Sequence, residues 1–389
     1  MKGFKFSGIH AGIKKKDQKD LGLIYCEKPA VAAALFTRNK VIAAPVILGK
    51  EKIKSGLCQA VLVNSGNANC FTGDKGIEDA KMCSKIAANT LGIAEELVCV
   101  SSTGVIGAAL PMDKFKTGIP DLAENLSENR VDDFANAILT TDTHSKIVKK
   151  NADIKGEKFS IMGIAKGSGM IRPDMATMLA YICTDVDINA KDLKKALQDA
   201  NEKSFNRISI DGDTSTNDTL LMLANAESNA TINDLESKKQ FQYLLDQVCF
   251  ELASIIVRDG EGATKLVKII VKGAKTKQDA FKACEVIAHS NLVKTAIYGE
   301  DPNWGRITAA AGRSGADLDP DKIDLFFDDQ ALVLKGIWQG IAAEEKTAQI
   351  MKKKEIEITL DLNLGKEIDF FLFCDFSENY VKINAEYRS

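Results

Sequence analysis

Apolar residues recur along the chain in two spacings, and each spacing predicts a different kind of secondary structure. Short runs rich in Val, Ile, Leu and Thr predict strands, and they lie at 60–66, 97–104, 177–188, 266–273 and 355–363. Apolar residues three and four positions apart predict amphipathic helices, and they lie at 76–91, 191–203, 233–257 and 276–289. Because strands and helices mix throughout, the pattern predicts an α/β protein with stacked sheet and helix layers.

Two of these helices are expected to begin at a capping residue. An acidic residue follows three positions after both Asn233 and Thr276, which is the spacing of a capping box. A cap side chain accepts a backbone N–H of the first helical turn. We therefore expect Asn233 and Thr276 to be caps, and Asp259-Gly260 to end the first of the two helices.

The composition is that of an ordinary globular protein with a sizeable core. The chain has 389 residues, of which 45% are hydrophobic, and a net charge of −3. This balance argues against nucleic-acid binding, and the two lysine runs at 14–16 and 352–354 are expected to be solvated surface. Without an apolar run long enough to span a bilayer, or a secretory leader, the chain is expected to act in the cytoplasm, away from membranes.

The cysteines and histidines lack the spacings of zinc sites and of thiol redox sites. The nine cysteines include no C-x-x-C pair, and the three histidines form no H-E-x-x-H motif, so we expect buried thiols and no metal site. The phosphate-binding patterns G-x-x-x-x-G-K-[ST] and G-x-G-x-x-G before a helix are also missing. We therefore expect no nucleotide cofactor.

Four polar, glycine-rich segments stand out, and each admits two interpretations. The segment 101–107 (SSTGVIG) can turn backbone N–H groups toward a developing oxyanion or can be an ordinary turn. The segment 211–219 (DGDTSTNDT) suits a hard cation or a hydrogen-bonded turn. Glu261, between two glycines in 258–265, can face a ligand or follow a helix C-cap. The segment 298–306 can anchor the fold or contact a substrate.

Thr177 raises a separate question, because it lies between a glycine-rich loop and an apolar strand in KGSGMIRPDMATMLAYICTD (166–185). A threonine hydroxyl needs a neighbouring base to act as a nucleophile. As the first residue of a chain, Thr177 would have its own α-amino group, with a pKa of roughly 7.7–8.0. Its hydroxyl could itself cut the Ala176–Thr177 bond through an ester. The alternative is a plain threonine at a strand entry.

Short motifs stand in order over nearly the full length of the chain, at 7–16 (SGIHAGIKKK), 43–46 (AAPV), 63–73 (VNSGNANCFTG), 101–107 (SSTGVIG), 140–143 (TTDT), 166–179 (KGSGMIRPDMATML), 211–219 (DGDTSTNDT), 257–265 (VRDGEGATK), 296–307 (AIYGEDPNWGRI) and 380–389 (YVKINAEYRS). With these motifs the chain resembles the ArgJ family, the glutamate N-acetyltransferases (ornithine acetyltransferases) of arginine biosynthesis. Each motif is short, and their ordered combination is specific. The resemblance implies a layered αββα-type sandwich, similar in architecture to N-terminal-nucleophile hydrolases.

The resemblance also implies an activity and the residues that carry it. The precursor would cut itself between Ala176 and Thr177 into an α chain (1–176) and a β chain (177–389). Thr177 would take the acetyl group of N2-acetyl-L-ornithine and pass it to L-glutamate in a ping-pong reaction. The family's oxyanion positions match Thr103 and Gly104. Its substrate-binding positions match one threonine of 140–143, for which we favour Thr143, together with Lys166, Thr177, Glu261, Asn384 and Ser389.

The partners implied by the resemblance are small-molecule substrates and the chain's own two fragments, interlocked as α₂β₂ or larger. No cofactor is implied, although some members also use acetyl-CoA as a substrate, and the sequence leaves that open. Family members often end in Thr where this chain has Ser389, which keeps the hydroxyl. The rival hypotheses are an amidase or aminopeptidase of the same fold that uses water, and a non-catalytic binding protein.

Overall fold

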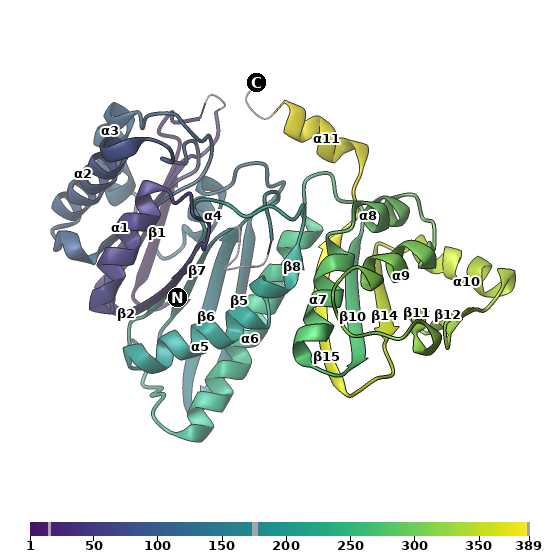
Figure 1. The fold of residues 1–389 in the computed structure, drawn as a ribbon. Coiled ribbons are helices and arrows are strands. Elements are labelled where there is room, and N and C mark those ends of the chain that lie inside the picture. The colour runs from purple at the N-terminus through teal and green to yellow at the C-terminus, as the bar shows by residue number, and fades with distance from the viewer. Residues whose placement is uncertain (15–16, 173–177, 387–389) are drawn as a thin grey trace. The chain divides into compact units, whose positions relative to one another are not determined.

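A computed structural model describes residues 1–14, 17–172 and 178–386 of the chain (Figure 1). The chain forms two compact units. The first comprises Met1–Asn206 and Asp213–Ile256, and the second comprises Arg207–Gly212 and Val257–Ser389. Each unit has its own mixed β-sheet and its own core, and the two are described in turn.

The first unit is built on an eight-stranded sheet with the strand order β4-β3-β2-β9-β7-β6-β5, and β1 pairs with β2. The bounds of its strands are β1 Phe4–Ile9, β2 Leu21–Phe36, β3 Leu57–Asn64, β4 Val98–Ser102, β5 Lys146–Ile154, β6 Glu157–Lys166, β7 Leu179–Thr184 and β9 Thr219–Ala224. The neighbours β7 and β9 are parallel, whereas β6 and β7 are antiparallel. Their ends therefore bring residues from distant parts of the chain together.

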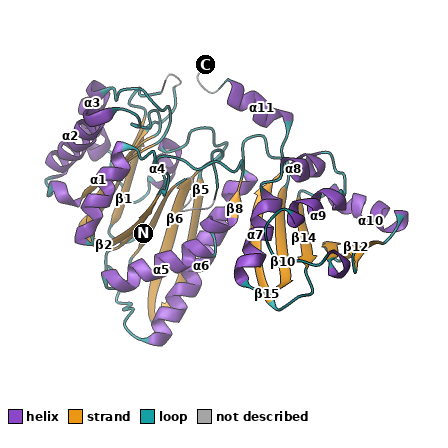
Figure 2. Cartoon of the chain, viewed as in Figure 1, coloured by secondary structure: helices purple, strands orange, loops and turns teal. Residues whose placement is uncertain are grey.

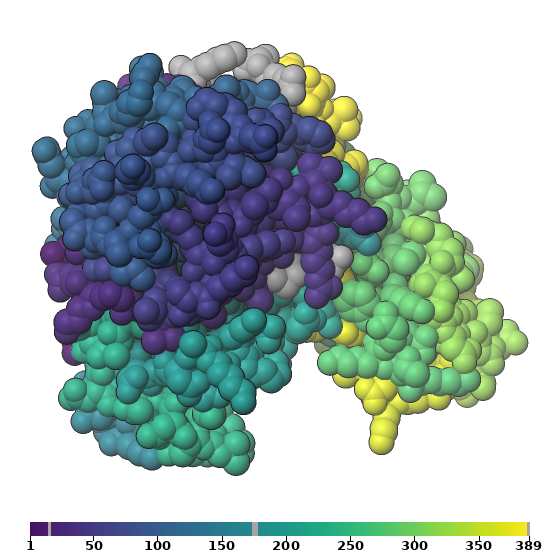
Figure 3. Space-filling model, turned by 60° about the vertical axis from the view of Figure 1, so that its left-hand side comes forward, coloured from purple at the N-terminus to yellow at the C-terminus, as the bar shows by residue number. Residues whose placement is uncertain are grey.

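The long strand β2 joins two halves of this sheet. Its pairing with β3 shifts register between Tyr25 and Ala30, and beyond that point residues 31–36 pair with β9. A single core cluster contains Val63 of β3 together with Tyr181 of β7 and Leu221 of β9. The two halves therefore pack face to face, and the space-filling view shows N-terminal residues packed directly on those near 180–250 (Figure 3).

Helices cover the outer faces of both halves (Figure 2). On one side, α2 (Gly73–Leu91) and α3 (Met112–Glu124) pack on β3 and β4 through a second core cluster. On the other side lie α5 (Ala190–Glu202), against β2, and α6 (Leu235–Arg258). A Cβ on Gly163 of β6 would lie 2.5 Å from Leu252 of α6, so this helix lies directly on the sheet. The helix–sheet–sheet–helix layers confirm the expected fold class.

The remaining helices of this unit are short. They are α1 Ala44–Lys52 and α4 Val131–Ala137. Phe134 of α4 belongs to the core between the two half-sheets, with its ring 5.6 Å from that of Tyr181. This contact fixes the chain that leads from α4 to residues 140–143.

The second unit has a seven-stranded sheet with the order β13-β12-β11-β14-β10-β15-β8. The bounds of its strands are β8 Ile208–Ser209, β10 Leu266–Ala274, β11 Asp324–Phe327, β12 Gln330–Leu334, β13 Ile337–Trp338, β14 Glu355–Asp361 and β15 Glu367–Cys374. Its helices are α7 Lys277–Ala288, α8 Asn291–Tyr298, α9 Trp304–Gly312, α10 Ile341–Met351 and α11 Glu378–Ala385. A buried ion pair between Arg207 and Asp369, with Nε 2.8 Å from Oδ1, ties β8 to β15.

Most of the expected elements are present with shifted ends. Thr276 caps α7 as predicted, because its side chain accepts the Asp279 N–H. The prediction for Asn233 was wrong by one residue, since Asp234 accepts the Ser237 N–H at 2.8 Å. The helix that follows ends at Arg258, just before Asp259-Gly260.

Several expectations from composition are confirmed and one is wrong. All nine cysteines are buried free thiols, and burial raises the pKa of Cys83 to about 12. Residues 352–354 are exposed, as expected for a solvated lysine run. In the run at 14–16 the expectation is wrong for Lys14, which is half-buried and whose ammonium donates to two backbone carbonyls. Lys15 and Lys16 lie outside the described residues. Within the described ranges, the chain contains no helix that is long and apolar enough to cross a membrane.

Candidate active site

The hydroxyl residues after β4 lie beside the end of β3. The backbone N–H of Thr103 donates to the carbonyl of Asn64 at 2.9 Å. The side-chain amide of Asn64 donates to the Ser102 hydroxyl at 2.7 Å. Asn64 and Ser102 are buried, so the predicted oxyanion loop starts from a rigid, hydrogen-bonded base.

Gly104 occupies a position that no other residue fits. Its φ is +125°, and a Cβ there would lie 2.6 Å from the carbonyl carbon of Gly66 and 2.7 Å from the amide nitrogen of Asn67. Both neighbours are backbone atoms, which cannot rotate away as a side chain can. The glycine after Thr103 is therefore required by the close approach of two loops.

Lys166 connects this loop to the start of β7. It is the last residue of β6, is 8% exposed, and pairs in register with Leu179. Its Nζ donates to the Thr103 hydroxyl oxygen at 3.3 Å. The structure thus brings together two residues that were predicted for different roles and are 63 positions apart in the sequence.

A buried carboxylate, Asp142, lies close enough to Lys166 to interact with its charge. Asp142 accepts the Lys146 ammonium and the Gly167 N–H, both at 2.6 Å. Burial alone would raise the pKa of Asp142, but the positive charges of Lys166 and Lys146 outweigh it and lower the pKa to about 2. Asp142 is therefore ionised, and its single negative charge offsets part of the positive charge of the two buried lysines.

The three threonines around Asp142 have different surroundings. The Thr141 hydroxyl shares a hydrogen bond of 2.7 Å with the Ser168 hydroxyl. Thr143, the favoured substrate contact, is exposed, and its hydroxyl lies 3.0 Å from Nδ1 of His144. The amide of Thr140 donates to Asp142. The Thr141 hydroxyl thus approaches the segment directly after Lys166.

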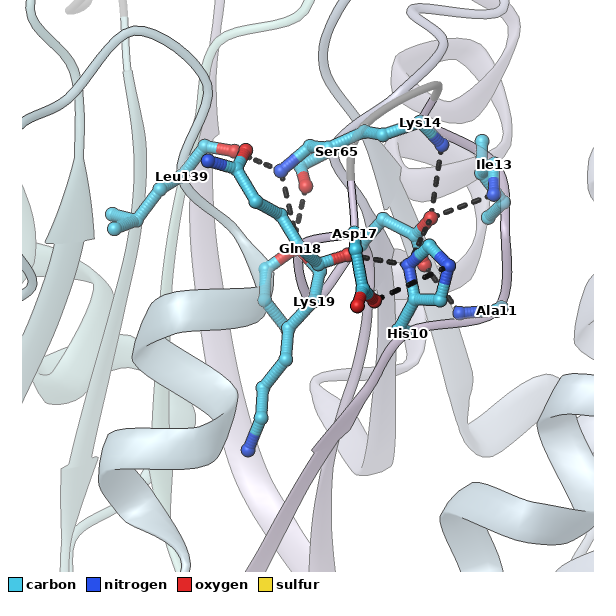
Figure 4. A network of polar contacts seen from close by, with 11 residues as sticks. His10, Ala11, Ile13, Lys14, Asp17, Gln18, Lys19, Ser65 and Leu139 are labelled. Atoms are coloured by element: carbon cyan, nitrogen blue, oxygen red, sulfur yellow. Dashed lines mark hydrogen bonds and ion pairs between the residues drawn. The ribbon is translucent and has the colours of Figure 1, made fainter.

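A third lysine, Lys14, lies beside the backbone of Leu139, as the close-up shows (Figure 4). In the loop between β1 and β2, buried Asp20 accepts the backbone N–H groups of Ala11, Ile13 and Lys14 at 2.6–2.9 Å. The Lys14 ammonium donates to the carbonyl of Leu139 at 2.7 Å. Burial, with a further contribution from the nearby charge of Lys166, lowers the pKa of Lys14 to about 8.

The segment 211–219 is a hydrogen-bonded turn in the part that enters β9. The side-chain amide of Asn217 donates to the carbonyls of Ala68 and Ser102, at 2.6 and 2.8 Å. The Thr37 hydroxyl donates to the carbonyl of Ser215 at 2.7 Å. Among the described residues, no cluster of metal-ligating side chains is present here or elsewhere.

In the second unit, two more of the predicted residues meet. Glu261 is 8% exposed and its Oε2 accepts the side-chain amide of Asn384, in α11, at 2.8 Å. Gly262 has a φ of +69°, and a Cβ there would lie 2.6 Å from the amide nitrogen of Tyr380. The Ser377 hydroxyl donates to the Gly262 carbonyl at 2.6 Å. These contacts hold the Glu261 turn against the start of α11.

The turn around 298–306 has an anchoring role. The Arg306 guanidinium donates to the carbonyl of Leu292 at 2.9 Å, and the Asn303 side chain caps α9. Trp304 packs against the core of the second unit. Of the two interpretations of this segment, the structure shows the contacts that anchoring requires.

The predicted residues thus form two separate groups, Thr103, Gly104 and Lys166 in the first unit and Glu261 and Asn384 in the second. Ala176, Thr177 and Ser389 lie outside the described residues. Sequence reasoning assigned no role to Lys14, Asp142, Asn217 or Asp218. Their only signal was membership of the motifs at 7–16, 140–143 and 211–219.

The fold and these groups define a class of protein. In the first unit, buried Lys166 and buried asparagine side chains lie at strand ends, beside the Thr103 hydroxyl and the obligatory Gly104. This is a layered α/β protein whose candidate site is built on hydroxyl and amide groups. The chain belongs to the ArgJ family, because a sequence model of that family matches residues 5–389.

Curated relatives match over the whole chain. The arginine biosynthesis bifunctional protein ArgJ of Geobacter sulfurreducens is 48% identical, with 100% of each chain covered. The glutamate N-acetyltransferase of Methanocaldococcus jannaschii is 46% identical, covering 100% of this chain and 97% of the relative. A crystal structure of ArgJ from Bacillus halodurans is 38% identical with a TM-score of 0.50. The match covers 53% of this chain and 97% of that one.

Proposed function

We propose that this protein transfers the acetyl group of N2-acetyl-L-ornithine to L-glutamate, with Thr177 as an N-terminal nucleophile. Membership of the ArgJ family supports this proposal. The names of the two relatives support it as well, since one is a bifunctional protein of arginine biosynthesis and the other a glutamate N-acetyltransferase. The acetyl group would be carried as an ester on the Thr177 hydroxyl.

The observation that carries the proposal is the contact between Lys166 and Thr103. Lys166 pairs with Leu179, two residues after Thr177 along the chain, and donates to the Thr103 hydroxyl. The ammonium can only donate, so the Thr103 hydroxyl accepts from it and keeps its own hydrogen to donate elsewhere. That hydrogen and the Gly104 N–H are the proposed donors to the oxyanion.

The nucleophile would be made by self-cleavage. The Thr177 hydroxyl oxygen bonds to the Ala176 carbonyl carbon, the carbon–nitrogen bond breaks, and the nitrogen takes up a proton. Water then opens the ester, leaving a carboxylate on Ala176 and a free amine on Thr177. The Bacillus structure supports this step. The match spans 53% of this chain and 97% of the Bacillus chain, so the Bacillus chain is little more than half as long as this one, as a fragment of a cut precursor would be.

Acetyl transfer would follow in two half-reactions. The Thr177 amine takes the hydroxyl proton as the oxygen attacks the acetyl carbon, and ornithine leaves with that proton on its amine. The amine of glutamate then attacks the acetyl ester and releases N-acetylglutamate, and the Thr177 hydroxyl is restored. No cofactor is needed for either half-reaction.

The substrate contacts are proposals as well. The Lys166 ammonium suits a substrate carboxylate, and the buried Glu261 carboxylate suits an ammonium. The amide of Asn384 already donates to Glu261, which leaves the amide oxygen of Asn384 as an acceptor. Thr143 and Ser389 remain predicted contacts, and the two fragments are proposed to assemble as α₂β₂ or larger.

The first test is intact-mass spectrometry with N-terminal sequencing of the purified protein. Two fragments are expected, the second beginning TMLAYICTD. A single chain of 42.2 kDa would refute the self-generated nucleophile. A Thr177→Ala variant is expected to stay uncut and inactive, and turnover by that variant would contradict the mechanism.

The second test separates transfer from hydrolysis. Release of ornithine from acetylornithine is measured with and without glutamate, and equal rates would favour the rival amidase, which uses water. A parallel assay supplies acetyl-CoA and glutamate, because the Geobacter relative is named bifunctional. Product formation there would add acetyl-CoA to the donors.

A further inference from the structure

The loop that carries Glu261 cannot hold its shape by itself. Glu261 lies between Gly260 and Gly262, and the backbone at Gly262 has a φ of +69°. Glycine gives a backbone more accessible conformations than any other residue does. A carboxylate that binds a substrate ammonium tightly must nevertheless be oriented before the substrate arrives, because ordering it on binding costs affinity. Contacts from outside the loop must therefore fix it.

A buried carboxylate just after β15 supplies three of these contacts. Asp375 follows the last residue of β15 and is 2% exposed. Its Oδ1 accepts the N–H groups of Thr264 and Lys265, at 2.8 and 3.0 Å. Its Oδ2 accepts the Thr264 hydroxyl. Hydrogen bonds to a carboxylate are about twice as strong as those between neutral groups, so Asp375 anchors the chain three and four residues after Glu261.

The place of Asp375 follows from the pairing of two strands. β10 and β15 are antiparallel, and Leu266 pairs in register with Cys374. Asp375, one residue beyond this pair, therefore reaches the amides that come directly before β10. The ammonium of Lys265 donates to Glu300 instead, at 3.0 Å. The hydrogen bonds to the loop, and not an ion pair with this lysine, thus account for the buried carboxylate.

The residues after Asp375 hold the other end of the same loop. The Ser377 hydroxyl donates to the Gly262 carbonyl at 2.6 Å, and the side-chain amide of Asn384 donates to Glu261 itself at 2.8 Å. None of the residues of α11, which carries Asn384, is buried. The position of this helix therefore relies on polar contacts and on the chain that leads into it, and Asp375 lies at the start of that chain.

We propose that Asp375 is the positioning residue of the Glu261 loop, and that it keeps the Glu261 carboxylate oriented toward the substrate ammonium before binding. The inference rests on the substrate contact proposed above for Glu261. Asp375 does not touch the substrate and acts only through Glu261. Loss of Asp375 should therefore weaken substrate binding, and the losses caused at the two residues should not add.

The first test compares Asp375→Ala with Asp361→Ala and with the unaltered protein in steady-state kinetics. Asp361 is the matched control, because it ends β14, pairs with Lys272 at the far end of β10, and accepts the Asn363 N–H at 3.0 Å. We expect Asp375→Ala to raise KM for acetylornithine at least about tenfold with a smaller change in kcat. Asp361→Ala should keep the unaltered KM. An unchanged KM in Asp375→Ala, or an equal rise in both variants, would overturn the proposal.

Two further variants separate positioning from general stability. Asp375→Asn keeps an oxygen for the two N–H groups and can donate to the Thr264 hydroxyl, so KM should stay within about threefold of the unaltered value. In the Glu261→Gln background, Asp375→Ala should raise KM by less than about threefold, because the group through which it acts is already changed. A full rise in that background, or an Asn variant as impaired as the Ala variant, would overturn the proposal.

If Asp375→Ala fails to fold, a milder variant decides. Thr264→Val removes the hydroxyl that donates to Asp375 and leaves both backbone N–H groups in place. The KM for acetylornithine should then rise about threefold, as expected for the loss of one hydrogen bond. An unchanged KM in this variant would overturn the role of Asp375.

Hydrogen exchange followed by mass spectrometry examines the loop without any turnover. In Asp375→Ala the amides of Thr264 and Lys265 lose their acceptor, and they should exchange at least about tenfold faster than in Asp361→Ala. Unchanged exchange would overturn the anchoring by Asp375. An unaltered protein that transfers no acetyl group would instead refute the proposed function, and the exchange rates would still decide whether Asp375 fixes the loop.

Discussion

Replacing Gly104 by alanine perturbs the candidate oxyanion loop in a way that can be calculated from the structure. The added methyl group would lie 2.6 Å from the Gly66 carbonyl carbon and 2.7 Å from the Asn67 amide nitrogen. Ordinary contacts to such atoms begin near 3.4 Å. The two loops must therefore separate by the better part of an ångström, and the Gly104 N–H moves with them.

Gly107 provides a matched control in the same loop. Its φ of +85° is as unfavourable for alanine as that of Gly104, but a Cβ there meets nothing within 4 Å. Backbone strain at such a position costs about 1–3 kcal/mol, and this cost is shared by both variants. Overlap in a packed site adds about 1–3 kcal/mol for Gly104→Ala alone.

Two measurements check this prediction. Urea unfolding should show that Gly104→Ala lowers the free energy of unfolding by about 1–3 kcal/mol more than Gly107→Ala does. Acetyl transfer should show a loss of kcat of about 100- to 1,000-fold for Gly104→Ala and a small loss for Gly107→Ala. Equal kcat values for the two variants would refute the assignment of Gly104 to the oxyanion loop.

Three further predictions concern charged residues near the candidate site. The pKa of Lys14, about 8 in the folded chain against 10.5 ordinarily, means that the unfolded chain binds more protons at this residue between these values, so the contribution of Lys14 to stability should rise with pH across that window. The buried thiols titrate alike in both proteins, so urea unfolding should show the unaltered protein gaining stability relative to Lys14→Met from pH 8 to 10.5, and a constant difference would contradict the lowered pKa. Asp142→Asn removes the carboxylate that pairs with buried Lys146 and should lower the free energy of unfolding by about 3–5 kcal/mol at neutral pH. Because the pKa of Asp142 is lowered to about 2 from 3.8, the difference from the unaltered protein should shrink as the pH falls from about 4 to 2, and a constant difference would contradict the ion pair. Glu261→Gln keeps an acceptor for Asn384 but removes the charge, so KM for acetylornithine should rise at least about tenfold with a smaller change in kcat; an unchanged KM in steady-state kinetics would remove Glu261 from the substrate contacts.

Elements that depend on local interactions were predictable from the sequence. The cap at Thr276 needs only a side chain and an N–H three residues away, so a short pattern is sufficient. The one-residue error at Asn233 has the same origin, because Asn233 and Asp234 are both good caps. In the structure Asp234 also pairs with Lys155, 79 positions away, a contact that a short pattern does not contain.

For the candidate site, the sequence predicted the residues but not their contacts or their burial. Motif resemblance pointed to Thr103, Lys166, Glu261 and Asn384, and the structure adds the contacts within each pair. The motif resemblance could not show that Lys14 is half-buried, because a lysine run has the same composition on a surface as at the edge of a core. The burial of Lys14 is decided by Asp20 and by the carbonyl of Leu139, 125 positions away.

The α/β class, the glycines that tight turns require and the family of the chain all follow from short patterns in the sequence. The opposite pKa shifts of Asp142 and Asp218 depend on contacts that form only in the folded chain. Both are aspartates in polar motifs, yet one lies against two lysines and is ionised, whereas the other is buried beside Met178 and favours its neutral form. The physical reason is that a pKa depends on burial and on neighbouring charges, and both are set by residues far apart in the chain.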